Sequence, residues 1–135
     1  MSSEISGARA ILCRSAVEDV SGLSLFYLGL LARLARVEQG EGSFDELRQD
    51  ALRGAEETAF VTRLLDLEAA KLPEDEADPR QLIRPLRLIG ESMTLLATAA
   101  SAEDAQVRPL ASVEEIEALL KLEPTASLMR AFSQT

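Results

Sequence analysis

The chain has 135 residues, of which 47% are hydrophobic and only 4% aromatic, and its formal net charge is −9 at pH 7. This length suits one domain, the apolar content excludes disorder throughout, and the few aromatic residues favour an all-α core of leucine, alanine, isoleucine and valine. The acidic excess excludes direct nucleic-acid binding as a first expectation, because affinity for phosphates depends on lysine and arginine, and it favours solubility or a basic partner.

The first expected helix is long and unusually apolar. Residues 1–10 lack the basic segment and apolar core of a signal peptide. Ser15 and Glu18 match a capping box, in which the hydroxyl and the carboxylate each bind a free backbone N–H. A helix from about Ala16 to Val37 is therefore expected, with residues 4–14 forming a helical segment that precedes it or merges with it. Its apolar residues surround most of its circumference, which is typical of a central helix or of one buried in an oligomer.

Within this helix, Phe26, Tyr27 and Leu30 are candidates for an apolar ligand pocket or for the core of a dimer. The plainer alternative is that they pack in the core of the chain. The uncharged stretch from Val20 to Ala32 has 13 residues, which is too short for a bilayer, so no membrane span is expected.

The second helix should run from Phe44 to about Lys71, because Ser43 and Glu46 repeat the capping pattern. A seam of apolar and small residues recurs along it at helical spacing, and further apolar residues widen that face. The seam is Leu47, Ala51, Gly54, Thr58, Val61 and Leu65, and the wider face adds Phe60, Leu64 and Leu67. Residues 72–79, with four acids between two prolines, are expected to form a solvated loop.

The third helix should span Pro79 to Ala100, with Asp78 as its cap and Pro85 either kinking or restarting it. Its apolar residues repeat at steps of four and three, the narrow seam of coiled-coil-like packing. This seam is the candidate interface, and it comprises Leu82, Leu86, Ile89, Met93 and Leu96.

The C-terminal part should hold a linker at residues 101–111 and a short helix at 113–122, capped by Ser112 and stopped by Pro124. One more amphipathic turn should follow, within a C-terminal helical segment of residues 112–135. The expected fold is a single domain of residues 1–135, a bundle of four to six helices of which three are long. Because the short segments can hardly cover two such wide apolar faces, we expect a homodimer to complete the bundle.

The chain has no histidine and one cysteine, Cys13. These counts exclude Ser-His-Asp and Cys-His catalysis and zinc-finger spacing, and they leave Cys13 as a packed, inert thiol in a reduced, cytoplasmic protein. The glycines match no phosphate-binding loop, and the acidic loop lacks the spacing of an EF-hand. The sequence thus predicts no catalytic residue, no metal site and no cofactor.

Arg80, Arg84 and Arg87 are the one concentrated positive feature, and their spacing puts them on one helical face. They are candidate contacts for an anion or an acidic partner. The alternative is pairing with carboxylates of the same chain, above all those of the adjacent acidic loop.

These observations favour a non-enzymatic protein–protein interaction module, such as an adaptor, chaperone or regulator, that uses an apolar helical surface. Two alternatives stay open. One is a small-molecule-sensing regulatory domain with a cavity near Phe26, Tyr27 and Met93. The other is an enzyme that works with carboxylates and arginines alone, which converging acids with shifted pKa values would indicate.

Overall fold

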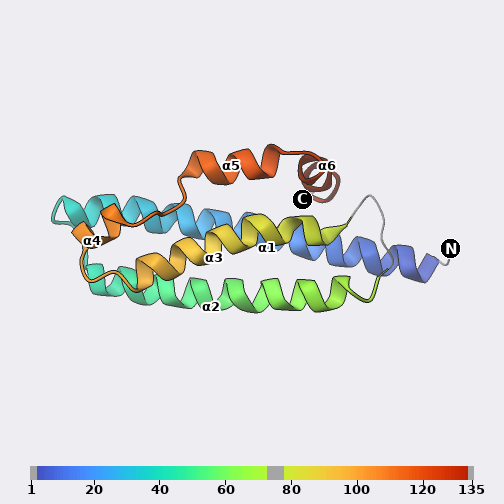
Figure 1. Ribbon diagram of the computed structural model, residues 1–135, viewed down its shortest axis with the longest axis horizontal. Helices are drawn as coiled ribbons and strands as arrows, with labels where there is room; N and C mark the ends of the chain where they lie inside the picture. Colours follow the sequence, from blue (N-terminus) through green and yellow to red (C-terminus); the bar gives the residue numbers. More distant parts are fainter. Residues whose placement is uncertain (1–2, 73–77, 134–135) are drawn as a thin grey trace.

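The computed structural model describes residues 3–72 and 78–133, and every regular element in them is a helix. Three long helices lie along the molecule (Figure 1): α1 (Ser3–Glu38), α2 (Phe44–Ala69) and α3 (Ile83–Ala97), with α2 running antiparallel to the other two. A 3-10 turn, η1 (Pro79–Leu82), leads into α3. Three short helices follow: α4 (Ala102–Val107), α5 (Val113–Lys121) and α6 (Thr125–Phe132). The all-α class and the count of helices agree with the expectation from sequence.

α1 is a single helix of 36 residues, so the early segment merges with the main helix. The capping box expected at Ser15 and Glu18 is wrong, since both residues lie mid-helix with exposed side chains. The physical reason is packing: a buried stripe continues through this point, because Cys13 and Ala16 are both buried in the core. Burial of that stripe outweighs a local cap signal.

At two of the other predicted starts, the serine is confirmed as the cap of its helix. Ser43 Oγ accepts a hydrogen bond from the backbone N–H of Glu46 at 3.2 Å, and α2 begins at the next residue after this cap. Ser112 Oγ accepts one from the N–H of Glu115 at 3.1 Å and starts α5 in the same way. Both bonds satisfy a donor that a helix N-terminus leaves free.

The linker expected at residues 101–111 is wrong in part, because it contains α4. Ser101 Oγ accepts from the N–H of Asp104 at 3.1 Å, and Asp104 in turn accepts from the N–H of Ala100 at 2.9 Å. This pattern is related to a capping box, but aspartate replaces glutamate and its carboxylate binds the N–H of the residue before the cap.

The helix expected from Pro79 to Ala100 consists of two elements, the 3-10 turn η1 and the helix α3. Asp78 accepts from the N–H of Arg80 at 2.9 Å and caps η1, after which α3 begins at Ile83. Pro85 falls in the first turn of α3, where its missing N–H has no intrahelical acceptor to lose. The acidic loop expected at 72–79 lies mostly at residues 73–77, outside the described part of the chain.

The seam of α3 packs between α1 and α2 and forms the centre of the core. Its five residues, Leu82, Leu86, Ile89, Met93 and Leu96, are all at most 1% exposed. α3 contacts both other long helices. This seam is the chain's own helix–helix contact.

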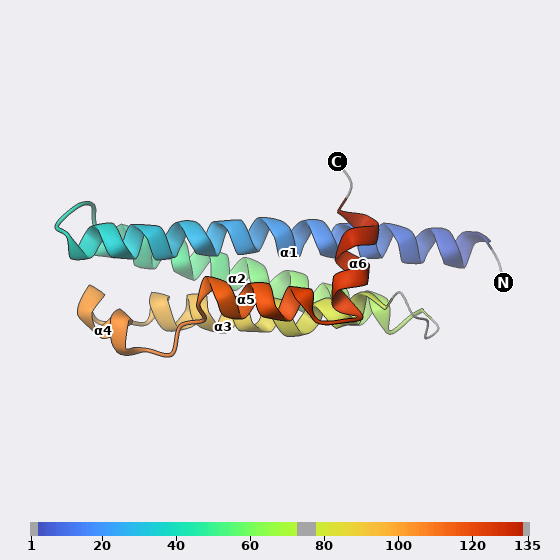
Figure 2. The ribbon, with the colours of Figure 1, turned by 90° about the horizontal axis from the view of Figure 1, so that it is seen from above.

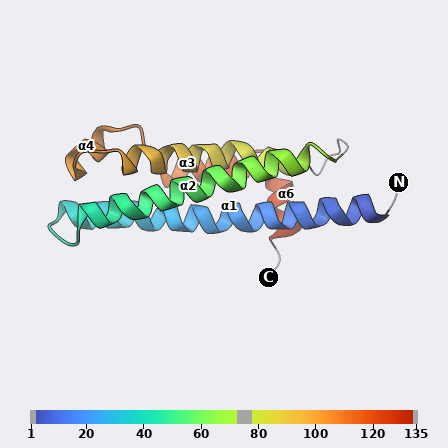
Figure 3. The same ribbon diagram turned by 90° about the horizontal axis from the view of Figure 1, so that it is seen from below.

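A second layer, made by the short helices, covers one side of α1 and α3. α5 lies along α3, and α6 crosses α1 (Figure 2). Two buried hydrogen bonds at Ala111 connect this layer to α1 and α3. The hydroxyl of Tyr27 donates to the Ala111 carbonyl at 2.6 Å, and Ser92 Oγ accepts from the Ala111 N–H at 3.0 Å. Seen from the opposite side, α1 and α2 lie in front of this layer (Figure 3).

Candidate functional site

The residues that the sequence singled out divide between the core and the surface. The five seam residues of α3 are buried in the chain itself and so are not accessible on its surface. Tyr27 and Leu30 are also core residues, 0% and 1% exposed, whereas Phe26 beside them is 41% exposed. Of the candidate dimer residues, only Phe26 can therefore contact a partner.

Arg80 and Asp78 form an ion pair, with Nη2 of Arg80 2.9 Å from Oδ2 of Asp78. Partial burial raises the pKa of the Asp78 carboxyl, but the hydrogen bonds and positive charge of Arg80, with a smaller effect from Arg9, outweigh it and leave the pKa below its usual value. The alternative of pairing within the chain therefore holds for Arg80.

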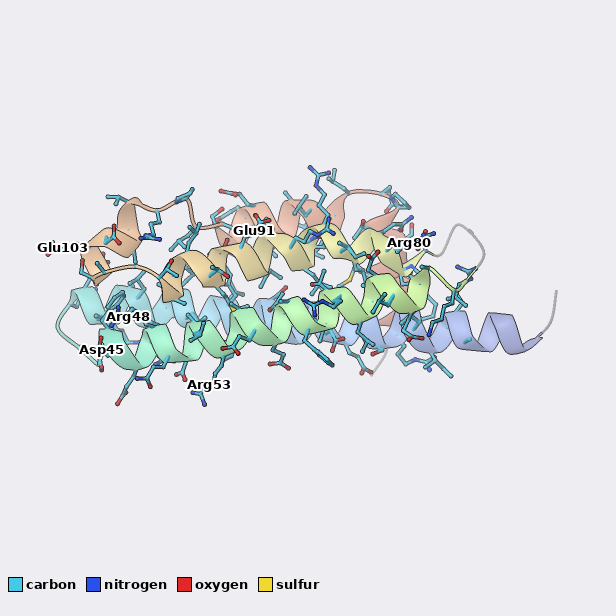
Figure 4. The ribbon with its side chains drawn as sticks, turned by 60° about the horizontal axis from the view of Figure 1, so that its bottom comes forward. Asp45, Arg48, Arg53, Arg80, Glu91 and Glu103 are labelled. Atoms are coloured by element: carbon cyan, nitrogen blue, oxygen red, sulfur yellow. The ribbon has the colours of Figure 1, made fainter. Side chains whose placement is uncertain are left out.

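Arg84 and Arg87 are exposed on α3 and line a surface groove of about 880 Å³ against α5. Side chains of both charges meet in this groove, and two of them, Arg80 and Glu91, are labelled in Figure 4. Its charged lining is Asp66, Arg80, Arg84, Arg87, Glu91 and Glu115. Such a mixed lining suits a polar partner surface better than a simple anion.

A second groove, of about 590 Å³, runs between α2 and α3. Its lining is mostly apolar and small, including Ala55, Ala59 and Gly90. Among residues 3–72 and 78–133, no cluster of three or more potential metal-binding side chains comes together.

The main surface feature is apolar and lies on the outside of the α1–α2 hairpin. α1 contributes Ile11 (67% exposed), Leu25 (70%) and Phe26, and α2 contributes Phe60 (64%), Leu64 and Leu67. We name these six residues the outer face. Phe60 lies seven positions after Arg53, whose side chain projects from α2 away from α3 (Figure 4), and two helical turns bring both to the same side.

The two halves of the outer face belong to one surface, because α1 and α2 pack side by side and antiparallel. Phe26 packs on α2 at Gly54, and Arg33 pairs with Asp50 at 2.7 Å one turn further along. The N-terminal half of α1 therefore lies beside the C-terminal half of α2. Asp50 lies nearer the end of the hairpin where α1 and α2 are connected. Hydrogen bonds from Arg33 and Arg53 hold the pKa of its carboxyl below the usual value.

The sequence contains a signal for this surface, the residues that widen the apolar face of the second helix. Phe60, Leu64 and Leu67 follow steps of four and three on the side of α2 opposite its buried seam. An apolar stripe opposite an already complete seam indicates a second contact surface.

Asp19 lies at the edge of this surface, on the side of α1 that faces α2. Burial raises the pKa of its carboxyl, and the negative charges of Glu57 on α2 and of the adjacent Glu18 raise it further. Because the folded pKa exceeds the unfolded value, the contribution of Asp19 to stability falls as pH rises from the ordinary 3.8 through the folded pKa. The ionised form therefore destabilises the fold at neutral pH.

We expect Asp19→Asn to raise the thermal unfolding midpoint at pH 7 and to leave it unchanged near pH 3, where the native aspartate is protonated too. Calorimetry at the two pH values measures this. Glu117→Gln, at an exposed acid on α5, is the matched control and should change little. A lower midpoint for Asp19→Asn at pH 7 would contradict the assignment.

Comparison with known proteins found no matching family model, no matching curated protein and no matching solved structure. In the described residues, one helix is long and apolar enough to cross a membrane by length and composition alone, at positions 7–38 of α1. The core helix of a soluble protein and a signal sequence near an N-terminus meet the same criterion, and 28% of the tested window is buried in the fold.

Proposed function

We propose that this chain is a non-enzymatic protein–protein interaction module, an adaptor, chaperone or regulator of the cytoplasm, that binds through the outer face. One observation carries the proposal. Of the nine large hydrophobic residues exposed in the described part of the chain, six belong to the outer face. Scattered apolar residues need no explanation, but a gathered patch on two adjacent helices is typical of an interaction surface.

Charged residues border the outer face and would select the partner. Glu18 and Arg36 lie on the exposed side of α1, and Arg53, Glu57 and Arg63 lie on that of α2. An apolar centre with a polar rim is the usual anatomy of a protein interface. The side chains of α1 and α2 form two rows along the hairpin. A helix of the partner would fit along the groove between these rows.

A small-molecule-sensing domain is the second candidate, and the groove between α2 and α3 supports it. Its 590 Å³ falls within the usual range of ligand pockets, about 300–1,000 Å³. Where a cavity was first expected, near Phe26, Tyr27 and Met93, two of these side chains pack closely on Gly54: a Cβ added there would lie 2.6 Å from Met93 Sδ and 2.7 Å from the Phe26 ring. Native mass spectrometry of the purified chain would detect a retained ligand.

The test of the proposed function compares binding by the unmodified chain and by the double variant Phe60→Glu, Leu64→Glu. Charges on the outer face should abolish association, whether with itself or with a protein captured from native lysate, and leave the helical circular dichroism intact. Val107→Glu is the matched control, because Val107 is 81% exposed but lies on α4, outside the outer face. Binding that survives the double variant would contradict the proposal.

A further inference from the structure

α1 carries two seams with the same spacing on different sides. One is buried in the bundle and comprises Arg9, Cys13, Ala16, Val20, Leu23, Tyr27, Leu30 and Leu34. The other repeats the same steps of four and three, two residues further along, and all eight of its residues are exposed. We name this exposed set the α1 stripe: Ile11, Ser15, Glu18, Gly22, Leu25, Gly29, Ala32 and Arg36. Steps of four and three are the repeat of two helices that pack along their length.

No contact within the chain requires the two glycines of the α1 stripe, Gly22 and Gly29. A Cβ added to Gly22 or Gly29 would meet nothing within 4 Å, whereas one at Gly54 or Gly90 would come within 3.0 Å of a packed side chain. The fold therefore requires glycine at 54 and 90 but not at 22 and 29. Since glycine inside a helix is destabilising, a close neighbour from outside the chain explains Gly22 and Gly29.

The α1 stripe is complementary to itself in shape when a second copy lies antiparallel. In one two-fold register, Leu25 faces Gly29 of the second copy, and Gly22 faces its Ala32. Each larger side chain then meets a small one, and symmetry makes every pair occur twice. This is how knobs fit into holes between closely packed helices.

The same register is complementary in charge, because Glu18 faces Arg36 of the second copy. Both side chains are exposed, and within the described residues neither forms an ion pair in its own chain. Sliding the helices by one heptad leaves Glu18 unpaired, opposite Gly29 in one direction and beyond the end of α1 in the other. Charge thus selects one register among those that fit in shape.

We propose that the partner of the α1 stripe is the α1 helix of a second copy, packed antiparallel in this register. The inference rests on the proposed function, since it assigns an occupant to the α1 half of the outer face.

A lipid bilayer fits the α1 stripe less well than a second helix. Glu18 and Arg36 belong to the stripe, and both would lose water without gaining a partner. The other side of α1 is fixed in the bundle through Val20 and Tyr27, which are 0% exposed. α1 therefore cannot enter a membrane without giving up its contacts with α2, α3 and α6.

The test measures the dissociation constant of the dimer of the full chain by dilution calorimetry. Glu18→Arg and Arg36→Glu should each weaken the dimer by about tenfold or more, because each change acts twice in a symmetric dimer. The combined variant Glu18→Arg, Arg36→Glu should restore the constant to near that of the unmodified chain. Failure of this rescue would overturn the register.

A steric pair of variants completes the test. Gly29→Leu should abolish the dimer, because Leu25 of the second copy needs that space. Gly7→Leu should leave the dimer unchanged, since Gly7 has the same open surroundings but lies beyond the end of the paired helix. Equal effects of the two changes would overturn the proposal, as would sedimentation of the chain with vesicles of neutral phosphatidylcholine in place of self-association.

The outcomes separate this inference from the proposed function. A chain that stays monomeric, yet captures a protein in a manner lost in Phe60→Glu, Leu64→Glu, overturns the second copy as partner and keeps the interaction module. A chain that neither dimerises nor captures anything specific overturns both. A dimer lost in Gly29→Leu and rescued by the charge exchange supports both.

Discussion

Met93→Ala is expected to lower the free energy of unfolding by about 2–5 kcal/mol, the usual result of truncating a buried methionine. Met93 is 0% exposed, and its Sδ lies where a Cβ on Gly54 of α2 would collide with it. Neighbours so tightly placed can collapse only partly into the space that the truncation leaves. Urea denaturation followed by circular dichroism measures the loss.

The control for Met93→Ala is Leu25→Ala on the α1 stripe. Leu25 is 70% exposed, so its truncation should change the stability of the monomer by no more than about 0.5 kcal/mol. Both variants are measured at the lowest practical concentration, because self-association would add to apparent stability. If Leu25→Ala proved more destabilising than Met93→Ala, the assignment of Met93 to the core and of Leu25 to the surface would be wrong.

Gly54→Leu is expected to destabilise the fold by roughly 1–3 kcal/mol or more, because the new side chain enters a filled space. Its Cβ alone would lie 2.7 Å from the Phe26 ring, where α1 and α2 meet. The gain in helix propensity from replacing glycine, about 1 kcal/mol, offsets only part of this. The unfolding midpoint in urea should fall without a change in the slope.

Gly22→Ala provides the opposite expectation and hence the control. No atom lies within 4 Å of the added Cβ, so only helix propensity acts, and the monomer should gain about 0.5–1 kcal/mol. A loss of monomer stability in Gly22→Ala comparable to that in Gly54→Leu would show that both glycines pack inside the chain.

Periodicity predicted the three long helices and α5, but it predicted neither α4 nor which sides of the helices the bundle covers. The α3 seam was correctly identified as a packing stripe, yet its assignment to a partner interface depended on what α1 and α2 leave uncovered. Likewise, Phe26 and Tyr27 are neighbours in a helix apolar nearly all round, and only the bundle separates them: Tyr27 bonds to Ala111, while Phe26 stays at the edge. Such choices depend on contacts between residues far apart in sequence.

Local signals were ambiguous for the same reason. Ser15–Glu18 and Ser43–Glu46 match one pattern, but only Ser43 caps a helix. Ser15 lies inside α1, because the buried stripe through Cys13 and Ala16 continues past it. A cap contributes about 1 kcal/mol, and the burial of several apolar side chains exceeds it.

The outer face is the part of the candidate site that sequence reasoning came closest to finding. The surplus of apolar helix surface was recognised from the sequence and led to the expectation of a partner. Its location required the structure, since only the short helices decide that the side near Ala111 is covered while Leu25 and Phe60 remain exposed. The open surroundings of Gly22 and Gly29 likewise depend on how the helices pack.

The central claim is that the outer face is a binding surface whose first occupant is a second copy of the chain. Sedimentation equilibrium of the unmodified chain, over a series of concentrations at pH 7, tests it most directly. The claim predicts a mass that rises from 14.6 kDa toward twice that value and levels off there. A mass of 14.6 kDa at every concentration would contradict it.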